Sequence, residues 1–176
     1  MTSNERPGRD EAAEYYFKYI ELVPAGDVTV ALAAQLPETL AMFSGISEEM
    51  SLNRYAPAKL TIRQVLAHLN DTERLFVFRA MWFARGMEAP LPSFDQDICS
   101  QQDGAEARSW QSLTEEFGAI RSSTVSFFRH LPAEAWSRRG IASGNPFSVR
   151  ALAYISAGHV THHTAILRDR YLAAPA

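Results

Sequence analysis

Apolar residues recur at helical spacing in four long segments of the chain. Residues 28–43, 61–84, 109–131 and 149–171 each place apolar side chains three or four positions apart, which gives a helix one apolar face. No stretch alternates apolar and polar residues in the way that marks a half-buried strand. The pattern predicts an all-α protein in which four amphipathic helices pack as an up-down four-helix bundle.

Short polar residues mark where several of these helices begin. Asp27, Thr61 and Ser148 each stand directly before an apolar periodic segment, where a side-chain oxygen can accept a hydrogen bond from a free backbone N–H. Gln64 follows Thr61 by three residues and completes a capping-box pattern. We therefore expect helices to begin directly after these three capping positions.

The segments between and before the long helices are less regular. Residues 11–22 carry an aromatic face and predict a short extra N-terminal helix. Pro37 lies inside the first long segment and predicts a kink or a break there. Residues 87–104 and 138–146 contain proline and glycine and are expected to be connections, the first of them long enough for a functional role.

Length, composition and charge narrow the class of protein. A chain of 176 residues fits one hydrophobic core, so we expect a single domain over residues 1–176 with an ordered core at about 11–172. Apolar residues make up 47% and charged residues 21%, the balance of a soluble globular protein. The net charge of −3 offers no basic surface to a phosphate backbone, so no nucleic-acid partner is expected. No apolar run is long enough for a membrane span.

The cysteine content and the first residues bear on the cell compartment. Cys99 is the single cysteine, which excludes an intramolecular disulfide framework. Residues 1–10 are polar, and no apolar signal-peptide core follows them. Both observations predict a cytoplasmic protein.

Three of the five histidines lie close together in the last predicted helix. His159 and His163 are four residues apart, so they lie about 40° apart around the helix axis and can present two imidazoles to one point. His159 and His162, three residues apart, are allowed to do the same. Neutral imidazole binds zinc, nickel, iron and copper well. Periodicity alone leaves the choice between these two pairs open.

His68 lies on the apolar face of the helix predicted for residues 61–84. A single histidine there is most often a hydrogen-bonded core residue, but two histidines on another helix of the same bundle make it a candidate third ligand. His130 stands at a predicted helix end, two residues before Pro132, and is expected to interact with the helix dipole.

Three segments of the sequence resemble the DinB-like family of metal-binding helical bundles. They are residues 55–74, which read YAPAKLTIRQVLAHLNDTER, residues 85–97 and residues 148–163. The likeness extends from about residue 16 to about residue 171. It departs from the family at Val160, where many relatives carry an acidic residue, and at Leu60, which replaces a frequent tryptophan.

The resemblance implies a ligand set and a range of activities. The metal of the family is held by one histidine from the second long helix and two from the last, which here are His68, His159 and His163. Zinc or nickel is expected first, with iron or manganese as alternatives. Family members with known activity include S-transferases that use low-molecular-weight thiols, hydrolases and isomerases.

Two classes of function follow from a three-histidine metal site. Three neutral ligands leave the ion its charge and an open position, which suits thiol S-transfer first and hydrolysis second, on a small-molecule substrate such as a low-molecular-weight thiol. The alternative is a noncatalytic, metal-stabilised bundle that acts as a dimerisation or binding module, and a homodimer is left open. An enzyme needs an open coordination position that faces a pocket, whereas a structural site is closed and dry.

Asp71 is the one tentative catalytic residue. It follows His68 by about one helical turn, so it can face the metal as a proton acceptor or as a partner of a ligand. It can equally lie on the surface beside Arg74.

Other candidates lie in the long connection and among the arginines. The connection carries Phe94, Asp95, Asp97 and Cys99 and is expected to cover the mouth of the site. Cys99 is a candidate reactive thiol, although a small buried cysteine is the more common case. Three arginines are candidates for binding a carboxylate of the substrate: Arg63, Arg79 and Arg85. The simpler expectation for each is a charged side chain on a solvent-exposed helix face.

Overall fold

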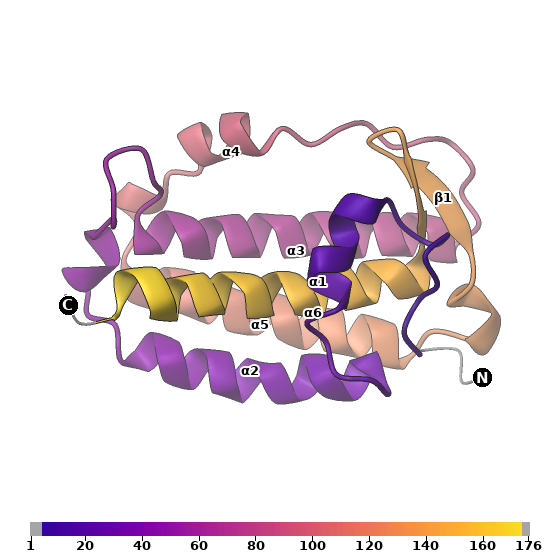
Figure 1. Ribbon diagram of the computed structural model, residues 1–176, viewed down its shortest axis with the longest axis horizontal. Coiled ribbons are helices and arrows are strands. Elements are labelled where there is room, and N and C mark those ends of the chain that lie inside the picture. The colour runs from indigo at the N-terminus through magenta and orange to yellow at the C-terminus, as the bar shows by residue number, and fades with distance from the viewer. Residues whose placement is uncertain (1–4, 174–176) are drawn as a thin grey trace.

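The computed structural model describes residues 5–173 and consists mainly of helices. Four long helices lie side by side (Figure 1). They are α2 (Val28–Ser44), α3 (Ile62–Ala84), α5 (Trp110–Arg129) and α6 (Val149–Ile166). The expected all-α four-helix bundle is confirmed.

The expected up-down order does not hold throughout the bundle, because α3 and α5 run in the same direction. The start of α3 lies beside the start of α5, because the Arg63 guanidinium donates to the Arg108 carbonyl at 2.7 Å. Further along, Glu73 of α3 pairs with Arg121 of α5, so the two helices run in the same direction. The connection between them therefore runs the whole length of the bundle and leaves α3 and α5 parallel (Figure 1).

Several short elements join the long helices. They are a 3₁₀ turn (Glu14–Tyr16), α1 (Phe17–Ile20), 3₁₀ turns at Met50–Leu52, Ala105–Ala107 and Ala133–Ala135, α4 (Gln96–Gln102), β1 (Arg139–Ala142), β2 (Asn145–Ser148) and a π-helical turn (Leu167–Tyr171). The extra N-terminal helix is thus reduced to α1 and the turn before it, and the connection expected at residues 87–104 contains α4.

The connection expected at residues 138–146 is a β-hairpin, which the sequence analysis did not predict. β1 and β2 pair antiparallel, and Ser143 and Gly144 between them have φ angles of 52° and 72°. Two adjacent residues with positive φ form the tight turn that suits the twist of a hairpin. Each strand has four residues, which is too short for alternation to stand out.

The helix caps agree with the expected starts, while Pro37 does not break its helix. Thr61 and Gln64 form a complete capping box, and Asp27 and Ser148 also accept backbone hydrogen bonds at their helix N-termini. The predicted break at Pro37 is wrong, because α2 continues through it. Pro37 lies on the exposed side of α2, where water can solvate the carbonyl that loses its partner.

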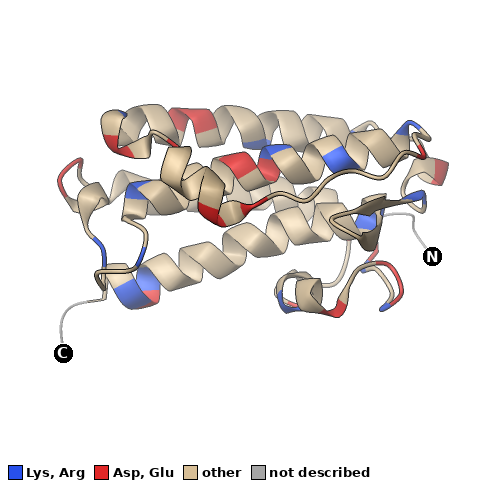
Figure 2. Ribbon diagram, turned by 90° about the horizontal axis from the view of Figure 1, so that it is seen from above, with Lys and Arg blue, Asp and Glu red and all other residues tan. Residues whose placement is uncertain are grey.

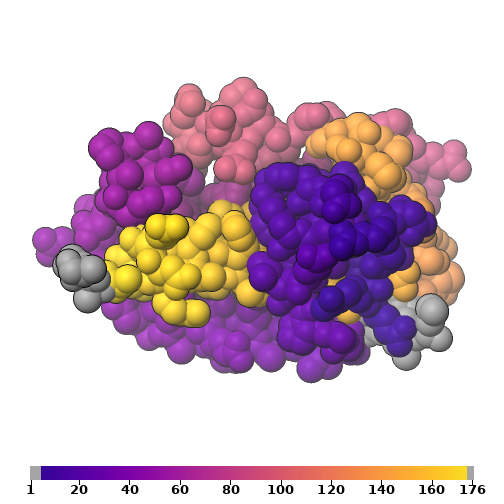
Figure 3. Space-filling model, viewed as in Figure 1, coloured from indigo at the N-terminus to yellow at the C-terminus, as the bar shows by residue number. Residues whose placement is uncertain are grey.

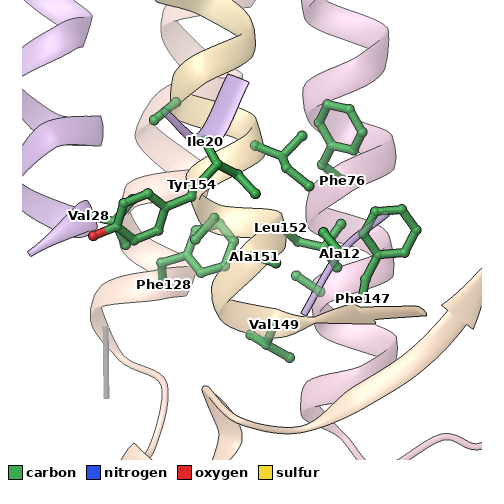
Figure 4. Packing of buried hydrophobic residues seen from close by; sticks show 14 of the residues in the cluster. Ala12, Ile20, Val28, Phe76, Phe128, Phe147, Val149, Ala151, Leu152 and Tyr154 are labelled. Carbon is green, nitrogen blue, oxygen red and sulfur yellow. The ribbon is translucent and has the colours of Figure 1, made fainter. Parts of the chain in front are cut away.

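Apolar side chains fill the bundle in two clusters, one toward each end. Figure 4 shows the cluster around the first half of α6, with Tyr154 and Phe128 on one side of this helix and Phe76 on the other. The second cluster gathers at the other end of the bundle around Phe43 and its neighbours on α3 and α5. Nearly all of these side chains are buried, which supplies the main free energy of folding.

A buried polar network joins all four long helices. The Arg121 guanidinium donates to both carboxylate oxygens of Glu73, at 2.9 and 2.7 Å, and to Gln35 Oε1 at 2.5 Å. Gln35 in turn donates to the Ala157 carbonyl at 3.0 Å. Because both charges are almost fully buried, each depends on the other for compensation, which fixes the register of the helices.

Candidate metal centre

Three histidines converge between α3 and α6. His68 comes from the middle of α3, and His159 and His163 come from successive turns of α6. Their candidate ligand atoms all lie within 4.8 Å of one another. His159 Nε2 is 3.2 Å from His68 Nε2 and 3.1 Å from His163 Nε2. Two nitrogens about 2.05 Å from one zinc ion at a tetrahedral angle lie about 3.3 Å apart, so this spacing fits a shared metal.

The His162 ring lies outside this group. It packs edge-on against Tyr19, with ring centroids 5.3 Å apart. Tyr19 reaches α6 because Gly158 lets the two backbones approach closely: a Cβ built on Gly158 would lie 2.0 Å from the Tyr19 carbonyl oxygen. α1 therefore covers the side of α6 that carries His162, while His159 and His163 face α3.

Thr72 sets the protonation of the His159 ring. Its hydroxyl is 2.6 Å from the His68 carbonyl oxygen and 3.3 Å from His159 Nδ1. The single hydroxyl proton is donated to the carbonyl, so the hydroxyl oxygen accepts from Nδ1–H of His159. This places the ring proton on Nδ1 and leaves the lone pair of Nε2 directed at the other two histidines, as a metal ligand requires.

Burial keeps the three rings neutral. It lowers the pKa of His68 to about 4 and that of His163 to about 3, the latter with help from the nearby His68. The pKa of His159 is also held well below its usual value, by burial first and by His163 next. At neutral pH all three imidazoles therefore offer lone pairs to a cation without first losing a proton.

A small cavity opens directly onto the histidine group. Its volume is about 140 Å³. The side chains that line it are Tyr15, Tyr16, Tyr19, His68, Thr72, Leu75, Phe76, Arg79, Phe94, Gln96, Ser143 and His159. Figure 3 shows a hollow on this face, between the N-terminal segment in indigo and the crossing segment in pink. Among the described residues that line the cavity, none carries a carboxylate.

Comparison with known families identifies this arrangement. A family model of the DinB superfamily matches residues 31–167, which include all three histidines. The chain belongs to the DinB superfamily. The resemblance noted from the sequence motifs is thereby confirmed.

The fold of this DinB-superfamily chain is also similar to a solved structure. YfiT from Bacillus subtilis, described as a probable metal-dependent hydrolase with an unusual four-helix bundle topology, matches with a TM-score of 0.68. The two share 16% identity over 93% of each chain, so the likeness shows the fold alone. A search of curated proteins found no significant match.

Asp71 lies away from the cavity in this DinB-superfamily chain. Its carboxylate is 3.5 Å from the Arg74 guanidinium, and 42% of its side chain is exposed. It is not among the residues that line the cavity. The structure therefore places it in the surface position that the sequence analysis left open.

The crossing segment covers the cavity in part. Phe94 lines the cavity, but Asp95 instead caps α4 by accepting from the Asp97 and Ile98 N–H groups at 3.0 Å. Cys99 is half-buried on α4 and is not a lining residue.

The three candidate arginines have different surroundings. Arg63 is buried and bonded to Ser51 and to backbone carbonyls, so it holds the start of α3 in place. Arg85 is exposed at the end of the same helix. Arg79 alone lines the cavity.

Sequence reasoning missed Thr72, the tyrosines of the N-terminal segment and Ser143. Thr72 could have been found, because it follows His68 by four residues and so lies on the same face of α3. The tyrosines and Ser143 come from segments whose positions no helical pattern specifies.

The distribution of charge and the length of the helices bear on nucleic-acid binding and on membrane insertion. In the view from above, acidic and basic residues are spread over several elements and form no single basic face (Figure 2). Within residues 5–173, no helix is both long enough and apolar enough to cross a membrane.

Proposed function

We propose that this chain binds one divalent metal ion through His68, His159 and His163 and is a metal-dependent enzyme. The convergence of three neutral imidazole nitrogens, with Thr72 holding the His159 proton on the far side of the ring, carries the proposal. Such a ligand set suits zinc or nickel first.

The cavity favours catalysis over a purely structural metal. A structural site is enclosed by its ligands, whereas here a cavity of about 140 Å³ reaches His68 and His159 and leaves room for a further ligand. The fold-level likeness to a protein described as a probable metal-dependent hydrolase supports metal-dependent chemistry in the same direction.

Thiol transfer is the preferred reaction, ahead of hydrolysis. A divalent metal ion in this site lowers the pKa of a bound thiol or water molecule toward neutrality. A thiol starts from a pKa near 8.5 and so needs little help to ionise, whereas water is far less acidic and gains more from a nearby base. Because no carboxylate lines the cavity, the residues of this chain suit a low-molecular-weight thiol better.

A metal titration of matched histidine variants tests the proposal. Protein purified without a histidine tag is stripped of metal and titrated with zinc or nickel, with His163→Ala and His162→Ala beside the parent. His163→Ala should lose tight binding because two imidazoles remain, and His162→Ala should keep it because that ring is not part of the three-histidine group. The opposite result, or a parent without metal affinity, would refute the ligand set. A thiol-transferase screen of the metal-loaded parent then tests the reaction.

A further inference from the structure

Arg79 is a buried cation for which residues 5–173 supply no anionic partner. Only 2% of its surface is exposed. Its guanidinium donates to Ser143 Oγ at 2.8 Å and to the Pro92 carbonyl at 3.3 Å, both neutral acceptors. Within residues 5–173 no carboxylate pairs with it, and its buried Nε has no hydrogen-bond partner.

Burying a guanidinium without a carboxylate is costly, which sets Arg79 apart from the other buried arginines. Arg121 has Glu73 and Arg63 has Glu48 as ion-pair partners. Burial lowers the pKa of Arg79, and the neighbouring Tyr16 hydroxyl offsets this only in part. A guanidinium stays protonated in proteins, so the charge remains in the cavity wall.

The position of Arg79 relates it to the histidine group. It follows His68 by eleven residues on α3, which places both side chains on nearly the same face, about 16 Å apart along the axis. Long side chains on a helix point back toward its N-terminus, so the guanidinium reaches to within roughly 10 Å of the histidines. Thr72 and Phe76 line the cavity between them.

We propose that Arg79 is the specificity-determining residue of the cavity and binds the carboxylate of a small organic acid. The reacting group of that acid then lies at the three histidines. The assignment therefore rests on the proposed function, for which it specifies the class of substrate. The cavity volume of about 140 Å³ corresponds to about five water molecules, which limits the substrate to a compact acid. Its lining, with one fixed cation and no carboxylate, favours an anion.

The test compares thiols that differ only in their far end. Mercaptohexanoate and mercaptohexanol are titrated by calorimetry into the zinc-loaded parent, Arg79→Gln, Arg79→Lys and Arg85→Gln, an exposed arginine at the end of the same helix. The parent and Arg85→Gln should prefer the carboxylate by about tenfold or more, the worth of one charge-assisted hydrogen-bond pair. Arg79→Gln should lose this preference, and Arg79→Lys should keep part of it.

Chain length supplies a second measurement, on the parent alone. Mercaptobutanoate is too short to span roughly 10 Å but too long to close a small chelate ring on zinc, so its preference over mercaptobutanol should be much weaker than that of the longer pair. A parent without preference for mercaptohexanoate, or a preference that survives in Arg79→Gln, would overturn the assignment. Two separate titrations distinguish the two hypotheses. A zinc titration in which the parent does not bind the metal counts against the proposed function. A thiol titration of the metal-free parent in which mercaptohexanoate binds no better than mercaptohexanol counts against the assignment of Arg79.

Discussion

Replacing Thr72 by valine removes one hydroxyl and keeps the shape of the side chain. In the parent this hydroxyl accepts from His159 Nδ1–H at 3.3 Å and donates to the His68 carbonyl at 2.6 Å. Valine leaves the Nδ1–H of a ring that is only 5% exposed without a partner, at a cost of about 1–3 kcal/mol. The ring then gains from turning or from moving its proton to Nε2, and either change spoils the ligand. We expect Thr72→Val to weaken zinc binding about 10- to 100-fold.

The assay is a competition titration against a chromophoric chelator, with two controls. Thr72→Ser keeps the hydroxyl and should bind zinc nearly as the parent does. Thr114→Val removes a hydroxyl that likewise bonds the carbonyl four residues earlier, Trp110 at 2.9 Å, but lies on α5. It should leave zinc affinity unchanged. A Thr72→Val protein that folds normally and binds zinc within about twofold of the parent would refute the role of Thr72 in orienting His159.

Two further predictions concern stability. Metal-free protein should lose stability as the pH falls from about 6.5 to 4, because in this range the unfolded chain takes up a proton that the buried His68 does not. The loss is up to about 1.4 kcal/mol per pH unit for each such histidine. In thermal melts the melting temperature of His68→Leu should depend less steeply on pH than that of the parent, and an equal dependence would refute this expectation. Thr61→Ala should cost about 1 kcal/mol by removing the capping box of α3, and an unchanged urea midpoint would count against that cap.

The choice between His162 and His163 shows what helical periodicity can and cannot predict about the site. Both rings are allowed beside His159 by their spacing on one helix, and the apolar neighbours of the two stripes are too similar to decide. The structure separates them by the direction of the two rings: His163 Nε2 lies 3.1 Å from His159 Nε2, whereas the His162 ring packs against Tyr19 of α1 and is not part of the three-histidine group. Nothing in the pattern of α6 itself specifies where a four-residue helix from the other end of the chain will pack.

The buried ion pair of Glu73 and Arg121 is a second feature beyond the reach of the pattern. Charged residues on an amphipathic helix are expected to face water, so the sequence pattern does not predict that Glu73 and Arg121 are buried. The pairing depends on α3 and α5 running parallel at one register, and this follows from the long crossing connection between them. The local caps were predictable because they depend only on residues within one turn, as Thr61 and Gln64 show.

The proposed metal ligands and the cavity wall of this protein come from different parts of the chain, so family membership says less about the substrate than about the ligands. All three histidines come from α3 and α6, whose packing the bundle determines. The wall opposite them comes from the N-terminal segment, the crossing segment and the hairpin, which contribute Tyr16, Phe94 and Ser143. Segments outside the bundle supply none of the three histidines, so they can differ between proteins while the ligand set stays the same. A shared ligand set is therefore compatible with many substrates, and substrate choice in this chain should be sought in the other side chains that line the cavity: Arg79 of α3 and the residues of the three segments outside the bundle.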